Sequence, residues 1–467
     1  MKACYTISNV MTWKVTFVTL EKQRLFTNRM LVRLIVPLVI EQALSILVGM
    51  CDGVMVSSAG EAAISGVSLV DMINNVILKL FAALATGGAV ITSQYLGARD
   101  DENARRSAGQ LVLMAGFFGL AIMVLCLVFA HGLMKLFFGS ITEDVMSAGL
   151  LYFRITALSF PFIALYNAGA AIFRSIGNSK VSMKVSFLMN LLNVGGNAVC
   201  IYGLKMGVAG VAIPTLISRA VAAVLMLYLT SRPVNRICLR LGSLRRVQFG
   251  MMKNILHIGI PSACENGIFE LGRVLVVSMI ALFGTTQTSA NAVANNLDAV
   301  GIIVGQAMSL AMITVVGQCV GAGDLDQAIY YIKKLMLAVY VVQGACNLIM
   351  CAFLPQLIGL YSSLSPETVK LAETLVRIHA LCGVVLWPAA FVLPNALRAA
   401  NDVKFTMVVG IGSMFVWRIS FSYLLCVRLG YGAVGVWIAM VIDWVCRSSF
   451  IVWRMLSGKW KQKCGLA

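Results

Sequence analysis

The sequence predicts an all-α integral membrane protein whose twelve transmembrane helices form two homologous bundles of six. Of the 467 residues, 60% are hydrophobic and only 12% are charged, and the mean hydropathy is +0.88. Soluble domains carry about 25% charged residues. Residues 111–130 and 335–354 are uncharged runs, each long enough for a helix to cross a hydrocarbon core of ~30 Å. Such runs exclude a membrane β-barrel, whose shorter strands alternate apolar and polar residues.

A tandem repeat predicts the two bundles. The segment QYLGARDDENA begins at Gln94, and QCVGAGDLDQA begins at Gln318, 224 residues later. The same shift pairs Pro37 with Pro261, Glu41 with Glu265, Asp100 with Asp324, Arg174 with Arg398, and Lys180 with Lys404. Two homologous halves of six helices follow. Because six is even, both halves enter the membrane from the same side, so a pseudo-two-fold axis along the membrane normal should relate them.

The apolar runs place the helices along the chain. In the first half we expect spans at residues 31–57, 62–96, 104–130, 145–174, 181–204 and 208–231, and in the second half at 251–283, 286–320, 327–354, 367–399, 404–427 and 433–456. They define an N-terminal lobe (31–231) and a C-terminal lobe (251–456), with a cytoplasmic N-terminal segment (1–30), a basic cytoplasmic linker (232–250) and a cytoplasmic tail (457–467). Residues 1–30 hold only a short apolar run, so no signal peptide is expected.

The positive charge is concentrated on one side of the predicted membrane. The net charge of +18 comes from 37 Lys and Arg against 19 Asp and Glu. With the N-terminus in the cytoplasm, most Lys and Arg residues fall in or beside inner loops, the positive-inside pattern. The largest inner group is Arg232, Arg236, Arg240, Arg245, Arg246 and Lys253. We expect a plasma-membrane protein (inner membrane in a bacterium) with cytoplasmic termini and contacts to anionic membrane lipid, and no nucleic-acid binding.

Other chemistries leave no pattern in the sequence. None of the 13 cysteines forms a CxxC pair, and His131, His257 and His379 lack the spacing of metal ligands. No GxxxxGK[ST] loop for ATP and no clustered nucleophile occur. We therefore expect no cofactor, no metal site and no enzymatic activity.

The repeated segments fall at the inner end of the second helix of each half. Gly97 and Gly321 can end these helices, and Asp100 and Asp324 are placed to cap the helices that follow. This position favours a structural elbow over a direct functional role.

Three features together resemble the multidrug and toxic compound extrusion (MATE) family. They are the paired Gln-x-x-Gly-Ala-x-Asp elbows at Gln94 and Gln318, the Pro-x-x-x-Glu starts of the first and seventh helices at Pro37 and Pro261, and the twelve-helix duplication. The resemblance covers residues 31–456. It implies a secondary transporter that expels small organic compounds, often cations, in exchange for H⁺ or Na⁺.

Asp52 is the most distinctive acidic residue of the first half. It lies fifteen residues after Pro37, about 22 Å along the first helix. In the family this proline and aspartate are linked to bending of the helix on protonation, and a proline that lacks an N–H makes a bend plausible. The resemblance assigns Asn193, Asn197 and Thr215 to the same polar network, with an amide in place of the second carboxylate. The alternative is that Asp52 is a satisfied polar residue near the interface.

The seventh helix carries Glu265 and Glu270, at positions where the family has helix-7 glutamates. Five residues turn a helix by about 140° beyond a full turn, so the two carboxylates do not share a face. Arg273 lies three residues beyond Glu270, which leaves open an ion pair instead of a functional role. Glu41 matches Glu265 through the repeat, which suggests a structural role that both halves need.

The second and eighth helices each carry a polar stripe. Its members are Asp71, Asn75 and Lys79 in one helix and Asn291, Asn295 and Asp298 in the other. They predict polar faces toward a common cleft for substrate or cation. A seam of interhelical hydrogen bonds explains the asparagines equally well. Carboxylates in the apolar thickness cost about 2.5 kcal/mol or more each, which favours a functional role for Asp298.

The tenth helix lacks the acidic residue of sodium-linked family members, and Trp387 stands at the matching place. This favours protons over sodium as the coupling ion. We expect a monomeric antiporter that alternates between inward-open and outward-open states, with Asp52 as the proton carrier and Glu270 and Asp298 near the substrate cation. The alternatives are a flippase for lipid-linked oligosaccharides and a channel or receptor-like membrane protein.

Overall fold

The computed structural model describes residues 24–58, 60–139, 141–239, 247–359, 361 and 364–464. Within these ranges the chain is helical, with short turns and no strand. Most of the predicted N-terminal segment lies outside the described residues, as do Arg240, Arg245 and Arg246 of the linker and the last three residues of the tail.

The twelve predicted helical segments are present in the described chain. The first half contains α1 (Asn28–Ser57), α2 (Glu61–Gly97), α3 (Asp101–Val128), α4 (Ala130–Phe138), α5 (Glu143–Ala157), α6 (Phe160–Ser175), α7 (Ser179–Ala198), η1 (Val199–Gly203) and α8 (Ala209–Thr230). The second half contains α10 (Phe249–Ala281), α11 (Thr285–Gly301), α12 (Ile303–Gly321), α13 (Leu325–Ala352), α14 (Leu354–Gly359), α15 (Pro366–Trp387), η2 (Pro388–Val392), α16 (Leu393–Ala399), α17 (Val403–Ser413), η3 (Met414–Ile419), α18 (Ser420–Ser422), η4 (Tyr423–Arg428), α19 (Gly432–Leu456) and η5 (Lys459–Lys463).

Length and hydropathy agree with a multi-pass membrane protein. Ten described helices are long and apolar enough to cross a membrane, and α5 with α6, bent by 46° at their junction, makes an eleventh. The remaining predicted span corresponds to the 33-residue α10, which is long enough to cross a membrane but, with Glu265, Glu270 and Arg273 in it, is not among these apolar helices.

Two predicted helices are broken where one continuous helix was expected. The span at 145–174 divides into α5 and α6 because Pro161, in the first turn of α6, has no N–H to continue the hydrogen-bond ladder. The span at 286–320 divides into α11 and α12, where Asn347 donates to the carbonyl of Gly301 at 3.3 Å.

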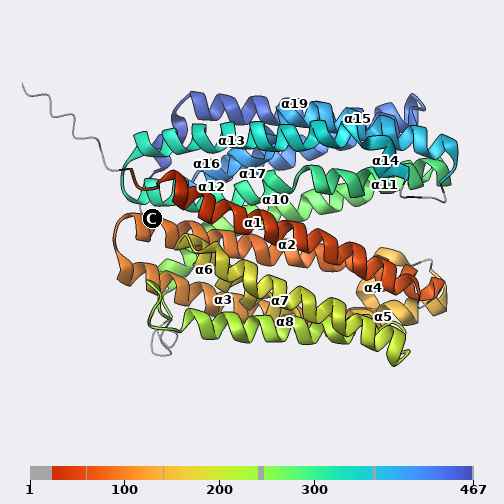
Figure 1. Cartoon of the computed structure of the whole chain (residues 1–467), viewed down its shortest axis with the longest axis horizontal. Coiled ribbons are helices and arrows are strands. Elements are labelled where there is room, and N and C mark those ends of the chain that lie inside the picture. Colours follow the sequence, from red (N-terminus) through yellow and green to blue (C-terminus); the bar gives the residue numbers. More distant parts are fainter. Residues whose placement is uncertain are drawn as a thin grey trace, which may run out of the picture.

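The helices form two bundles that lie side by side (Figure 1). The N-lobe, α1 to α8, makes one bundle, and the C-lobe, α10 to α19, makes the other. The first helix begins and α19 ends at the same end of the molecule, here called the terminal end. Each lobe centres on one apolar cluster, but the start of α1 (Leu31, Leu34) packs into the C-lobe cluster and the start of α10 (Ile255, Ile258) packs into the N-lobe cluster. Between the lobes, α2 packs against α10 and α12, and α1 packs against α12.

The repeated segments join the lobes at the terminal end. The capping prediction is confirmed: Asp100 accepts from the backbone N–H of Asn103 at 3.0 Å, and Asp324 accepts from that of Gln327 at 3.1 Å. The helices α2 and α12 end at Gly97 and Gly321, as predicted.

Close packing, rather than backbone conformation, explains why these two residues are glycines. The left-handed turn residues are Arg99 and Gly323, two positions further on. A Cβ on Gly97 would lie 2.0 Å from the carbonyl oxygen of Gln318, and one on Gly321 would lie 1.8 Å from that of Gln94. The ends of α2 and α12 therefore touch each other through their backbones.

Hydrogen bonds repeat the same symmetry. Gln94 Nε2 donates to the carbonyl of Ala399 at 2.9 Å, and Gln318 Nε2 donates to that of Ser175 at 2.7 Å. The 224-residue shift relates both donors and both acceptors. We call these two glutamines, the two elbow glycines and their partners the elbow contact. It closes the lobes onto each other at the terminal end.

Candidate functional site

The N-lobe brings the predicted coupling residues together as two pairs. Asn197 Nδ2 on α7 donates to Asp52 Oδ1 on α1 at 2.7 Å, and Asn193 Nδ2 donates to Thr215 Oγ1 on α8 at 2.9 Å. Both asparagines are buried, and in the described structure neither amide oxygen has a hydrogen-bond partner. Asp52 itself is half-buried. The site therefore offers one carboxylate with a donor beside it and two free acceptors close by.

Pro37 lies inside α1, which stays helical across it. A proline cannot donate to the carbonyl four residues before it, here that of Arg33. The hydroxyl of Ser179, at the start of α7, lies 3.4 Å from this oxygen and 2.5 Å from that of Leu34. The start of α7 thus places a hydroxyl donor beside the Arg33 carbonyl, which has no N–H partner within α1.

A second carboxylate lies near Asp52 in the N-lobe. Asp71 on α2 accepts from Tyr152 at 3.1 Å and from Asn74 at 3.4 Å. Both Asp71 and Arg219 on α8 act electrostatically on Asp52, and Arg219 Nη1 donates to Ser159 Oγ at 2.8 Å, at the break between α5 and α6. The sequence reasoning missed Asn74, Tyr152 and this role of Arg219. Asn75 and Lys79, the other members of the predicted stripe, are exposed.

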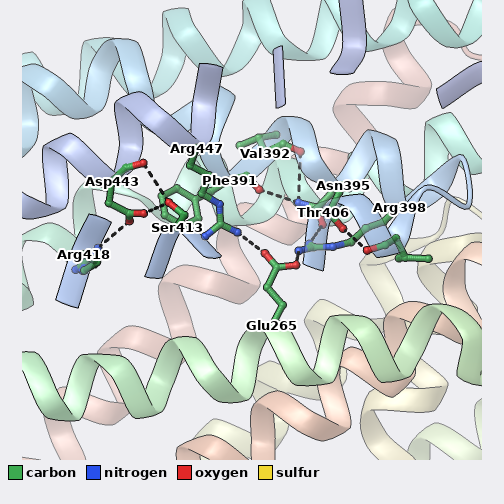
Figure 2. A network of polar contacts seen from close by, with 11 residues as sticks. Glu265, Phe391, Val392, Asn395, Arg398, Thr406, Ser413, Arg418, Asp443 and Arg447 are labelled. Atoms are coloured by element: carbon green, nitrogen blue, oxygen red, sulfur yellow. Dashed lines mark hydrogen bonds and ion pairs between the residues drawn. The ribbon is translucent and has the colours of Figure 1, made fainter. Parts of the chain in front are cut away.

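In the C-lobe, Glu265 is held by two arginines (Figure 2). Its Oε2 accepts from Arg398 Nη2 at 2.6 Å, its Oε1 accepts from Arg447, and only 4% of the residue is exposed. In the N-lobe, Glu41 accepts from Ser182 at 2.8 Å and lies 3.7 Å from Arg174. The two Glu–Arg pairs are related by the repeat. The N-lobe pair joins α1 to α6, and the C-lobe pair joins α10 to α16.

The neighbouring residues extend this network. Asp443 accepts from Ser413 and lies 3.7 Å from Arg418 (Figure 2). Asn395 donates to the carbonyl of Phe391 at 2.9 Å and accepts from Arg398 at 2.8 Å. Asn395 therefore donates a hydrogen bond to a carbonyl of the helical segment η2 and at the same time orients Arg398. Three arginines, Arg398, Arg418 and Arg447, thus share the two buried carboxylates of Glu265 and Asp443.

Glu270 makes the ion pair that the sequence left open. Its Oε2 lies 3.3 Å from Arg273 Nη1, and the side chains of the two residues are 16% and 50% exposed. Arg273 therefore supplies the Glu270 carboxylate with a positive partner without any substrate cation.

The polar stripe of α11 contacts three different partners. Asn291 Oδ1 accepts from Trp437 Nε1 at 2.9 Å, which agrees with a helix-contact seam, and Asn295 donates to the carbonyl of Asn291 at 2.8 Å. Asp298 Oδ1 lies against Nε2 of His379 on α15. The sequence reasoning missed His379, because spacing along one helix carries no signal of a partner on another. Within the described residues, no cluster of three or more His, Cys, Asp or Glu side chains could hold a metal ion.

The comparisons with known proteins match this duplicated architecture. The MatE family model matches residues 37–199 and 261–424, one match in each half. The chain belongs to the MatE family. Like other members it is a multi-pass membrane protein of a transporter family.

Relatives of this MatE protein align over nearly the whole chain. An uncharacterized transporter, YisQ of Bacillus subtilis, is 30% identical over 91% of this chain and 94% of its own length. A probable multidrug resistance protein, NorM of Thermotoga maritima, is 25% identical over 93% of this chain and 94% of its own. A solved MOP superfamily transporter from Pyrococcus furiosus superposes with a TM-score of 0.86 at 22% identity, over 93% of this chain and 96% of that one. That likeness supports the fold.

Proposed function

We propose that this MatE protein is a secondary active efflux antiporter that exports organic, cationic or amphipathic compounds in exchange for protons. The observation that carries the proposal is Asp52, a carboxylate on α1 whose hydrogen-bond partner, Asn197, is neutral. A titratable acid whose hydrogen-bond partner is uncharged can bind and release a proton. The names of NorM from Thermotoga maritima and Neisseria meningitidis, probable multidrug resistance proteins, support the substrate class.

The proton changes what Asp52 does in the network. The ionised carboxylate accepts the amide N–H of Asn197, whereas the protonated form also needs an acceptor. The amide oxygens of Asn193 and Asn197, which have no partner in the described structure, supply one once an amide reorients. Protonation therefore alters the contact between α1 and α7, the two helices that also meet at Pro37 and Ser179.

Alternating access then requires the elbow contact to open and close. It joins α2 of one lobe to α12 of the other at the terminal end. We place this end in the cytoplasm, because it holds both described chain ends and the basic loops that the positive-inside pattern assigns there.

Protons are favoured over sodium by the same chemistry. A sodium site needs several oxygen ligands with negative charge among them. Glu265 is fully engaged by two arginines, and residues 383–398 of the tenth span carry no carboxylate, so neither supplies that charge. Exchange of one proton for one monovalent cation is electrically neutral, so the pH gradient alone would drive it.

The three clustered arginines also raise the flippase alternative, since a lipid-linked pyrophosphate needs a basic site. Glu265 and Asp443 contact all three guanidinium groups, however, and the cluster is buried. This pairing favours a structural role for the cluster.

The test is efflux of a fluorescent organic cation from proteoliposomes under an imposed pH gradient or an imposed sodium gradient. We expect a response to the pH gradient that Asp52→Asn abolishes. The matched control is Asp144→Asn, which removes the same charge from an exposed position at the start of α5. Proton-driven efflux that survives in Asp52→Asn would refute the role of Asp52. A response to sodium alone would refute proton coupling, and a response to neither gradient would favour the flippase.

A further inference from the structure

A second titratable pair lies in the C-lobe, away from Asp52. His379 on α15 is 2% exposed, and its Nε2 faces Asp298 Oδ1 on α11. The contact is close but not aligned as a hydrogen bond, and within the described structure neither nitrogen of the imidazole has a hydrogen-bond partner. The side chain of Asp298 is 19% exposed, so the pair is reached through the carboxylate. Buried polar groups are nearly always hydrogen-bonded, so this exception calls for an explanation.

Two aromatic rings pack against the imidazole of His379. The His379 ring meets Trp444 edge to face with centroids 4.8 Å apart, and it meets Trp437 at 5.7 Å, both from α19. Trp437 is itself fixed by its hydrogen bond to Asn291 of α11. These apolar contacts hold the ring in place and leave Asp298 as its charged partner.

The other charged groups around the pair lie on η3, α10 and α19. Arg418 on η3 acts electrostatically on Asp298, and Arg273 on α10 and Asp443 on α19 act on Arg418. Glu270 of α10 pairs with Arg273. The pair of Asp298 and His379 therefore faces one guanidinium that is already shared with Asp443.

We propose that the pair of His379 and Asp298 is a second proton-binding site, in the C-lobe, that works beside Asp52. This inference rests on the proposed proton antiport. Unloaded, neutral His379 and ionised Asp298 carry a net charge of −1. One proton on the imidazole gives a neutral ion pair, which costs less to keep within a membrane. Histidine is the side chain whose charge changes near neutral pH.

Because Asp298 is partly exposed, a substrate cation can reach this carboxylate, and this couples cation binding to proton release. An organic cation that pairs with this carboxylate removes the counter-ion of the protonated imidazole, and the proton then leaves His379. Proton and substrate cation thus compete for one carboxylate. Each lobe would hold one proton site, so the number of protons released per cation bound should be larger than Asp52 alone provides. Exchange would then no longer be electrically neutral for a monovalent cation, and the membrane voltage would also drive it.

The first experiment measures proton release when tetraphenylphosphonium binds to the purified full-length protein in weakly buffered detergent solution, between pH 5.5 and 8. We expect His379→Gln to release fewer protons than the wild type and to lose one part of the pH dependence, while Asp52→Asn loses a separate part. The matched control, His257→Gln, makes the same substitution at an exposed position on α10 and should behave like the wild type. Equal release by His379→Gln and the wild type refutes the inference.

A second measurement keeps the test decisive if His379→Gln does not fold. The chain has only 3 histidines, so NMR of the wild type with ¹³C-labelled imidazoles can follow each one, with His257→Gln and His131→Gln used for assignment. We expect the buried histidine, His379, to bind a proton in the absence of substrate and to lose it when tetraphenylphosphonium is added. A histidine that keeps one charge state throughout would make the pair a static brace between α11 and α15. If wild-type binding of the cation releases no proton at any pH, the proposed antiport itself fails, which differs from failure of the second site alone.

Discussion

At the scale of single residues, the acids within the helices differ in what faces them. Glu41, Glu265 and Asp443 face guanidinium groups that lie within 4.0 Å. Asp52 and Asp71 accept hydrogen bonds from neutral amide or phenol groups. A fixed positive partner keeps a carboxylate ionised, whereas neutral donors let it exchange a proton. The charge of the partner therefore distinguishes the structural acids from the acids suited to proton coupling.

The structural acids should carry a large share of the stability of their lobe. Glu265→Gln leaves two buried arginines, Arg398 and Arg447, without a carboxylate, and breaking a buried ion pair costs about 3–5 kcal/mol. We expect a strongly lowered unfolding temperature in detergent. Glu41→Gln, at the equivalent position, should cost less because Arg174 is 3.7 Å away and Ser182 also bonds the carboxylate. Equal losses in the two variants would contradict this ranking.

A substitution at Asn197 tests the opposite change, the addition of a carboxylate instead of its removal. Asn197→Asp would place a second carboxylate against Asp52, at the 2.7 Å contact that the amide now makes. Two carboxylates at this distance cannot both ionise without a shared proton or a cation between them. We therefore expect sodium-driven efflux to appear in this variant, measured in proteoliposomes with an imposed sodium gradient. Asn193→Asp, whose amide bonds Thr215 instead, is the matched comparison, and an absent sodium response in Asn197→Asp would contradict the reasoning.

At the scale of helices, the sequence predicted most of the elements and few of their contacts. Uncharged runs predict the spans because a helix crosses the bilayer only if its residues are apolar. The break between α5 and α6 follows from Pro161, a signal that was present but unused. The pairing of Glu265 with Arg398 was also accessible, because the repeat pairs both residues with Glu41 and Arg174. Contacts such as Asp298 to His379 depend on how helices rotate against each other, which spacing in one sequence does not report.

The helix caps at the elbows allow a test at this scale. The backbone and side-chain amides of Asn103 lower the pKa of Asp100 below its usual range. Because the folded-state pKa is lowered, the cap contributes in full above the unfolded value of about 3.9 and is lost as the pH falls through the folded value. At pH 7, Asp100→Ala should therefore destabilise the protein by about 1 kcal/mol. Asp100→Asn, which can still cap α3, should stay near the wild type in thermal unfolding at pH 7, and an equal loss in both variants would point to charge rather than capping.

At the scale of the whole molecule, the two repeated elbow segments join the two lobes. Gln94 and Gln318 donate across the interface to Ala399 and Ser175, and the shift of 224 residues relates the two bonds. A symmetric contact of this kind opens as one unit when the lobes rock, because the two bonds lie at the same end of the molecule. The elbow is structural, as the sequence suggested, and it also sits where the two lobes must part.

The elbow glycines give the last prediction. A Cβ on Gly97 or Gly321 would overlap a backbone carbonyl at 2.0 or 1.8 Å, and a backbone atom cannot swing aside as a side chain can. Gly97→Ala with Gly321→Ala should therefore hold the terminal ends of the lobes apart without unfolding either core. Spin labels at the exposed positions Arg106 on α3 and Lys333 on α13, in a cysteine-free background, should report a longer distance than in the parent, and proton-driven efflux should be lost. Gly132→Ala on α4, where a Cβ has no atom within 4 Å, is the control. An unchanged distance together with full efflux would mean that the lobes do not close through this contact during transport.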